Sequence, residues 1–333
     1  MTESKHQVPA VLGSAVVTLD GPATPVPALI ADLGEPAAWR YLEFFTANIR
    51  NPNTRRAYLR ACSRFFAWCE DRGLELGTIR SIDVAAYIEL LQRQGQSAPS
   101  VKQQLAAVRM LFDWLITGQV VPSNPAAAVR GPKHVVTTGK TPVLNGDEWR
   151  KLFDSIPTDS LRDLRDRALI ATLTYSFARI GAALKLKVED LRPKGAGWEL
   201  MLREKGGKMH RMPCHHALAE ALRAYITAAG ITEDHKGWIF RTARGHNAHA
   251  LSDKPMNQQD AWSMIRRRAA AAGITAAIGN HSFRATGITA YLENGGQLEH
   301  AQSMAAHSSP RTTKLYDRSK DRLTQTEVEK IRL

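Results

Sequence analysis

The segment NHSFRATGITAYLENGGQLEHAQSMAAHSSPRTTKLY, residues 280–316, is the part of the chain that decides the fold. It is typical of three short helices joined by tight connections. Asn280 is a candidate N-cap for the first helix, and Gly295 is a candidate stop. The second helix is expected to end at His307. Helices this short fold back on one another, so polar side chains far apart in the segment can meet.

The third helix carries a lone tyrosine among polar residues. Ser309 is its expected cap, and Pro310 fills its first position, where a missing N–H costs nothing. Tyr316 then falls about two turns into the helix. A core tyrosine would normally have apolar neighbours at helical spacing, which Tyr316 lacks. The pattern therefore favours a chemical role, although an ordinary tyrosine remains the alternative.

Two charged or titratable side chains share the first turn of the first helix. His281 and Arg284 are three residues apart and so lie on one face. The first turn of a helix also presents backbone N–H groups and a positive dipole. This combination predicts a phosphate clamp, in which His281, Arg284, His307 and Tyr316 converge. Each histidine could instead be structural, or a metal ligand together with His300.

A tyrosine hydroxyl with a pKa near 10 is a poor nucleophile at neutral pH unless bases and cations surround it. Two arginines can hold the non-bridging oxygens of a phosphodiester and stabilise the charge of its transition state. Arg179, within the apolar run LTYSFARIGAALKLKVEDL, is the candidate for the second arginine, because a charge there is costly unless it is paired or used. A structural ion pair is the alternative for both arginines.

The bulk composition favours a polyanionic partner. The chain has 333 residues, a formal net charge of +13 and 44% hydrophobic residues. Such a surplus of positive charge is typical of nucleic-acid binding through counterion release, although it can also serve solubility alone. Three cysteines form no disulfide framework and favour a reduced, cytoplasmic chain. No apolar run is long enough to span a membrane.

Changes in composition predict the domain organisation. Residues 1–35 are rich in proline and predict a flexible N-terminal arm, whereas residues 36–130 predict a domain of four amphipathic helices. Residues 131–142 lack an apolar period and predict a linker, and residues 143–333 predict a mainly helical domain with a C-terminal tail helix. Within it, residues 197–214 alternate in polarity around a glycine pair, which predicts a β-hairpin with lysines at its tip. The helices of the first domain carry basic residues on their polar sides: Arg55, Arg56, Arg60, Lys102 and Arg109.

These residues together resemble the tyrosine recombinase, or phage integrase, family. Its signature is H-x-x-R, then a later G-H, then a tyrosine nine residues on. Here His281 and Arg284 match the first part, and Tyr316 follows His307 by nine residues. Arg179 resembles the first family box. The catalytic lysine of the family lies in a β-hairpin, usually in a G-K-G context, and Lys205 fits that context better than its rival Lys208.

The sequence departs from the family pattern at three alanines. Ala182 stands where the family usually has a glutamate that supports the geometry of the active site. Ala306 replaces the glycine before the second histidine, and Ala285 replaces a common histidine. None of these changes removes a proposed reacting group.

The resemblance implies a mainly α fold with a small β-hairpin or sheet, arranged as a two-domain, C-shaped DNA clamp with a SAM-like core-binding domain at 36–130. It also implies a mechanism without ATP or metal. Tyr316 would attack the phosphodiester and form a 3′-phosphotyrosyl bond, with Arg179 and Arg284 on the phosphate. Lys205 would protonate the leaving 5′-oxygen, His281 would assist proton transfer, and His307 would hydrogen-bond the phosphate.

The expected partner is double-stranded DNA, bound by a homo-tetramer on paired sites through exchange of the C-terminal tail. The same resemblance also implies accessory DNA-binding proteins, a nucleoid-associated location and an origin in a mobile element. Two other functions stay open. One is an architectural DNA-binding protein that keeps the fold without cleavage, and the other is a topoisomerase of similar chemistry.

Overall fold

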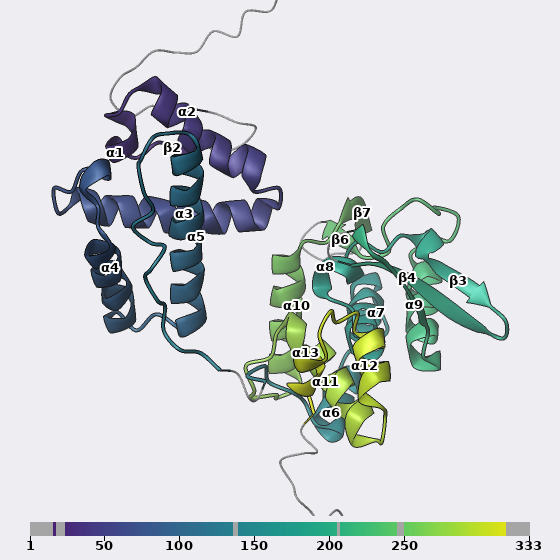
Figure 1. Ribbon diagram of the computed structural model, residues 1–333. Coiled ribbons are helices and arrows are strands. Elements are labelled where there is room, and N and C mark those ends of the chain that lie inside the picture. The colour runs from purple at the N-terminus through teal and green to yellow at the C-terminus, as the bar shows by residue number, and fades with distance from the viewer. Residues whose placement is uncertain (1–15, 18–23, 136–138, 205–206, 245–249, 318–333) are drawn as a thin grey trace, which may run out of the picture. The chain divides into compact units, whose positions relative to one another are not determined.

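The computed structural model describes residues 16–17, 24–135, 139–204, 207–244 and 250–317. The chain divides into two compact units, Met1–Val135 and Val136–Leu333 (Figure 1). Helices dominate both units, and the strands form only small antiparallel sheets. The predicted mainly α architecture with a small sheet is therefore confirmed. None of the described helices is long and apolar enough to cross a membrane.

The first unit is helical apart from two short paired strands at its start. Its elements are β1 (Val16–Val17), β2 (Thr24–Pro25), α1 (Ala28–Ala31), α2 (Glu35–Glu43), a π-helical turn (Phe44–Asn48), α3 (Pro52–Glu70), a 3₁₀ turn (Leu76–Thr78), α4 (Ser81–Arg93) and α5 (Ala98–Thr117). Most of the predicted arm, residues 1–15 and 18–23, lies outside the described residues.

An aromatic cluster holds the helices of the first unit together. Phe65 and Phe66 of α3 lie against Phe112 of α5, and Phe65 also meets Tyr87 of α4. All four side chains are almost completely buried. Aromatic edge contacts of this kind add to the stabilisation that burial provides. The helical period of apolar residues in α3 and α5 thus produces one shared core.

The second unit surrounds a central helix with shorter helices and two hairpins. Its elements are α6 (Gly146–Asp154), α7 (Leu161–Tyr175), α8 (Ile180–Ala183), a 3₁₀ turn (Val188–Asp190), β3 (Leu191–Lys194), β4 (Gly197–Arg203), β5 (Met209–Pro213), α9 (His216–Ala228), β6 (Arg241–Arg244), β7 (Ala250–Pro255), α10 (Gln258–Ala271), α11 (Asn280–Glu293), α12 (Leu298–Met304) and α13 (Pro310–Lys314).

Helix α7 is the centre of this unit. Residues 168–173 are all completely buried, because α9 and α11 pack against α7. Residues 168–173 are buried on several sides, which explains why this half of α7 is a run of apolar and small residues. The C-terminal end of α7 leads directly into the turn that carries Arg179.

The predicted hairpin exists as β4 and β5, which pair from Glu199 opposite Pro213 to Arg203 opposite Met209. Strand β3 extends it to a three-stranded sheet. A second hairpin, β6 with β7, was not predicted, because its strands RTAR and ALSDKP show no alternation of apolar and polar residues. Residues 245–249, which join the two strands, lie outside the described residues.

Candidate active site

A strained turn after α7 carries Arg179 and contacts Arg284. Phe177 has a φ of +52°, in the left-handed region that non-glycine residues rarely adopt. Its carbonyl oxygen accepts a hydrogen bond from Nη1 of Arg284. Two residues later, Arg179 stands at the N-cap of α8 with an extended backbone. The strain at Phe177 is typical of a site where the surrounding structure fixes an unusual backbone for a purpose.

Arg284 lies in the first half of α11 and is only 2% exposed. Its Nη2 atom lies 2.7 Å from the carbonyl oxygen of Ala305 and 2.7 Å from Nε2 of His307. Burial, and then the charge of Arg179, lower the pKa of the Arg284 guanidinium to about 10. The Tyr316 phenol opposes this shift through its charge and a side-chain hydrogen bond. Arg284 is therefore within electrostatic reach of both Arg179 and the tyrosine.

A glycine allows α11 to approach this turn. A Cβ atom at Gly287 would lie 2.0 Å from the carbonyl oxygen of Thr174 and 2.9 Å from the ring of Phe177. Any larger residue would push α11 away from the C-terminal end of α7. Gly287 thus lets Arg284, one turn earlier on α11, reach the Phe177 carbonyl.

His307 is held between Arg284 and the last helix. Its Nδ1 atom lies 2.9 Å from Oγ1 of Thr313, which is completely buried. Since a guanidinium can only donate, Nε2 must accept from Arg284, so Nδ1 carries the proton and donates to Thr313. Burial, and then the charges of Arg284 and Arg179, lower the pKa of His307 to about 4. The imidazole is therefore neutral at pH 7.

Tyr316 lies beside His307. The two rings are parallel within 7°, with centroids 5.9 Å apart. The prediction that Tyr316 lies two turns into a helix is wrong, because α13 ends at Lys314. Tyr316 sits in the following turn, where its carbonyl oxygen accepts a hydrogen bond from Thr289 of α11 at 3.2 Å. A turn rather than a helix places the phenol near Arg284.

His281 occupies the first turn of α11, as predicted, but the N-cap is Gly279 instead of Asn280. Partial burial, and then the charges of Arg284 and Arg179, lower its pKa. The two arginines thus act on both histidines. The structure brings together five of the six predicted site residues: Arg179, His281, Arg284, His307 and Tyr316.

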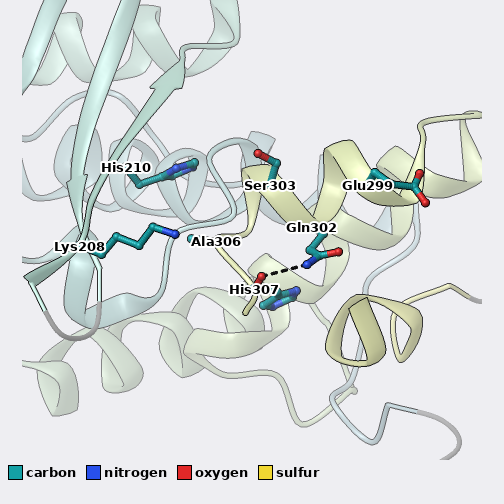
Figure 2. Close-up of a pocket in the computed structure, with 7 residues that line it drawn as sticks. All are labelled: Lys208, His210, Glu299, Gln302, Ser303, Ala306 and His307. Atoms are coloured by element: carbon teal, nitrogen blue, oxygen red, sulfur yellow. Dashed lines mark hydrogen bonds between the residues drawn. The ribbon is translucent and has the colours of Figure 1, made fainter. Parts of the chain in front are cut away.

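The sixth residue, Lys205, lies outside the described residues, as does Gly206. Its rival Lys208 lines a cavity of about 370 Å³ beside His307. Figure 2 shows the Lys208 side chain reaching toward Ala306, with Gln302 hydrogen-bonded to the His307 carbonyl oxygen on the opposite wall. The cavity is open and has polar walls, and it therefore suits a charged, hydrated ligand rather than an apolar one.

Three residues of the site were not predicted. Glu204 accepts a hydrogen bond from Nη1 of Arg179 at 2.5 Å, Thr313 fixes the tautomer of His307, and Phe177 presents its carbonyl to Arg284. Glu204 lies directly before the candidate lysine Lys205, and this position could have identified it from the sequence as a site residue. No sequence signal marks Phe177, because a carbonyl group belongs to every residue.

No group of three or more metal-ligating side chains gathers within the described part of the chain. A metal site built from His281, His307 and His300 therefore has no support in the geometry. Each site histidine instead has an arginine as its electrostatic neighbour.

Comparisons with known proteins agree with this geometry. The model of the phage integrase family matches residues 142–322, and that of the phage integrase N-terminal SAM-like domain matches residues 40–119. The tyrosine recombinase XerD of Mycobacterium leprae is 30% identical over 283 residues, which cover 79% of this chain and 86% of the relative. The tyrosine recombinase XerC of Xanthomonas campestris is 27% identical over 95% of this chain and 92% of its own length.

Solved structures show the same fold at lower identity. The XerH site-specific recombinase in a pre-cleavage complex with its difH substrate superposes with a TM-score of 0.64 and 17% identity, over 89% of this chain and 84% of that one. A lambda integrase bound to a core site gives a TM-score of 0.63 and 19% identity, over 85% and 76%. The family match across the second unit and the XerD relative show that the chain belongs to the phage integrase family. It is a tyrosine recombinase, an enzyme that breaks and rejoins DNA strands.

Proposed function

We propose that the chain carries out site-specific recombination of double-stranded DNA, with Tyr316 as the nucleophile. The observation that carries the proposal is the stacking of the Tyr316 ring on His307, which the buried Arg284 guanidinium contacts in turn. A buried guanidinium attracts a phosphate to the neighbouring phenol through charge-assisted hydrogen bonds. Attack on the phosphodiester forms a 3′-phosphotyrosyl bond and releases a 5′-hydroxyl group.

Arg179 and Arg284 bind the two non-bridging oxygens of the scissile phosphate. Arg179 is 35% exposed on its side chain, so that it can receive a ligand. Arg284 is buried and fixed by two carbonyl groups. Preorganised donors of this kind stabilise the charge that develops in the transition state, and each contributes about a hundredfold to a thousandfold in rate.

The remaining three side chains supply two proton transfers and one further hydrogen bond to the phosphate. Lys205 protonates the leaving 5′-oxygen, and His281 assists proton transfer at the tyrosine. His307 hydrogen-bonds the phosphate, whose negative charge raises the pKa of a neighbouring imidazole. A 5′-hydroxyl from a partner strand then attacks the phosphotyrosine and reverses the step, so the bond energy is retained without ATP or a metal ion.

The proposal extends to the assembly. A C-shaped clamp around the duplex would position the site. It would consist of a core-binding domain at 36–130, a linker at 131–142 and a catalytic domain at 143–333. Exchange of four strands requires four active sites, which favours a homo-tetramer on paired DNA sites. Exchange of the tail beyond residue 317, which lies outside the described residues, would link the protomers, and accessory proteins could order the complex. The setting would be the nucleoid of the cytoplasm, and the gene a mobile element.

The test uses nicked suicide substrates made from DNA that flanks the gene. Cleavage beside the nick releases a short fragment and traps the covalent complex, which migrates as a shifted band on a denaturing gel. Tyr316→Phe should bind the same DNA and form no covalent band. A band that persists in this variant would show that another residue is the nucleophile. Relaxation of a supercoiled plasmid that lacks paired sites would instead favour a topoisomerase.

A further inference from the structure

Glu204 is a buried carboxylate that contacts a candidate catalytic arginine. Its side chain is 5% exposed, and Oε2 lies 2.5 Å from Nη1 of Arg179. Burial of an unpaired carboxylate is unfavourable, so the ion pair holds both groups in one geometry. The pair joins the end of β4 to the N-cap of α8, two elements that are distant in sequence.

The backbone of Glu204 is as firmly fixed as its side chain. Its N–H donates to the carbonyl oxygen of Lys208 at 2.8 Å, and its own carbonyl accepts from Gly207 at 3.2 Å. These bonds join the residue after β4 to the two residues before β5. Both backbone polar groups of Glu204 are therefore hydrogen-bonded.

The two arginines of the site repel one another in the absence of DNA. The charge of Arg179 lowers the pKa of Arg284, whereas Glu204 acts on the same group in the opposite direction. Position 182, one turn after Arg179 in α8, is an alanine that is 4% exposed and supplies no charge. The carboxylate that steadies this pair of cations comes instead from the hairpin.

We infer that Glu204 is a positioning residue for DNA cleavage: its carboxylate holds Arg179 beside Arg284 while the exposed part of the Arg179 guanidinium stays open to the scissile phosphate. This inference rests on the proposed function. It assigns to Glu204 an effect on the rate of cleavage that is separate from its contribution to stability.

The test compares Glu204→Gln with Glu199→Gln. Glu199 is a matched control, because it lies on the same hairpin, is similarly buried, and pairs with Lys194 at 2.5 Å. Single-turnover cleavage of a nicked substrate, DNA affinity and melting temperature are measured for both variants. Glu204→Gln should cleave about tenfold to a hundredfold more slowly with affinity within about twofold of wild type, since small misplacements of a catalytic group cost this much. Glu199→Gln should cleave at the wild-type rate.

A second substrate separates Glu204 from the adjacent Lys205. Sulfur in place of the bridging 5′-oxygen leaves as a thiolate and needs no proton, because a thiol has a pKa near 8.5. The sulfur substrate should restore cleavage by Lys205→Ala but leave Glu204→Gln slow. Glu204→Asp, which keeps the charge, should recover part of the rate on either substrate.

Three results would overturn the inference: wild-type cleavage by Glu204→Gln, equal loss in Glu199→Gln, or rescue of Glu204→Gln by sulfur. The last would mean that Glu204 acts through Lys205 rather than Arg179. Wild-type protein that forms no covalent complex would contradict the proposed function itself, which distinguishes the two failures.

Discussion

Nη2 of Arg284 donates a hydrogen bond to Nε2 of His307 over 2.7 Å, across 23 positions of sequence. Burial, and then the charges of Arg284 and Arg179, keep the imidazole neutral. The bond directs its only proton, on Nδ1, toward Thr313. His307 therefore cannot donate to a phosphate through Nε2 in this arrangement. If His307 donates to the scissile phosphate as proposed, DNA must replace this bond, and the pair should respond together to the phosphate.

Replacement of Arg284 by lysine should separate cleavage from binding. Arg284→Lys keeps the positive charge and loses the planar fork that reaches Phe177, Ala305 and His307. Cleavage of a suicide substrate should fall by about a hundredfold or more, while affinity in a filter-binding assay changes much less. Equal losses in the two assays would make Arg284 an ordinary DNA contact.

The stability of the second unit should fall as pH drops from 6.5 toward 4. The folded-state pKa of His307 is about 4, below its unfolded value of 6.5, so the unfolded chain binds more protons in this window. This group alone should make the protein about 2 kcal/mol less stable at pH 5 than at pH 8. Urea unfolding of wild type and His307→Gln at both pH values measures the difference, and the variant should lack this component. An identical pH dependence in the two proteins would contradict the assigned pKa.

Ala306→Gly should stabilise the protein. Ala306 has a φ of +47°, a conformation that strains an alanine and suits a glycine. Glycine relieves this backbone strain but also has a greater chain entropy in the unfolded state, which offsets part of the effect. The free energy of unfolding should therefore rise by about 0.5–1 kcal/mol, visible as a higher melting temperature. Ala305→Gly is the control, since Ala305 is right-handed and buried and should lose stability on the same change.

Gly139→Ala should slow cleavage without weakening DNA binding. The Gly139 N–H donates to the Leu315 carbonyl oxygen at 3.1 Å, and a Cβ atom at 139 would lie 2.7 Å from that oxygen. The clash must displace the residue directly before Tyr316, with an expected loss of about tenfold in single-turnover rate. Gly131→Ala, whose Cβ would meet only side chains at 3.3 Å or more, should cleave normally. A normal rate in Gly139→Ala would show that the tyrosine does not depend on this contact.

Arginines of the first unit should divide into DNA contacts and structural groups. Arg60 is exposed on α3, whereas Arg109 donates to the carbonyl groups of Ala126 and Val129. If the polar face of α3 meets DNA, Arg60→Ala should reduce the slope of log affinity against log salt by about 0.9. Arg109→Ala should lower the melting temperature instead. A slope unchanged by Arg60→Ala would exclude that residue from the interface.

The sequence by itself determined the fold class and most of the candidate site. Residues at short spacing in a helix, such as His281 and Arg284, share one face because of helical geometry alone. A local sequence pattern predicts that geometry well. The alternation across 197–214 likewise predicted the β4–β5 hairpin, because strand period is a local property. The identity of the family followed from the same residues in the same order.

Only the tertiary structure decided how those residues meet. Contacts between elements that are distant in sequence produce three features of the site. These are the Glu204–Arg179 pair, the bond from Arg284 to the carbonyl oxygen of Phe177, and the turn that carries Tyr316. Such contacts depend on packing around α7. The spacing of apolar residues within one helix or strand contains no information about them. Glu204 is visible in the sequence, directly before Lys205, but its pairing with Arg179 could be found only in three dimensions.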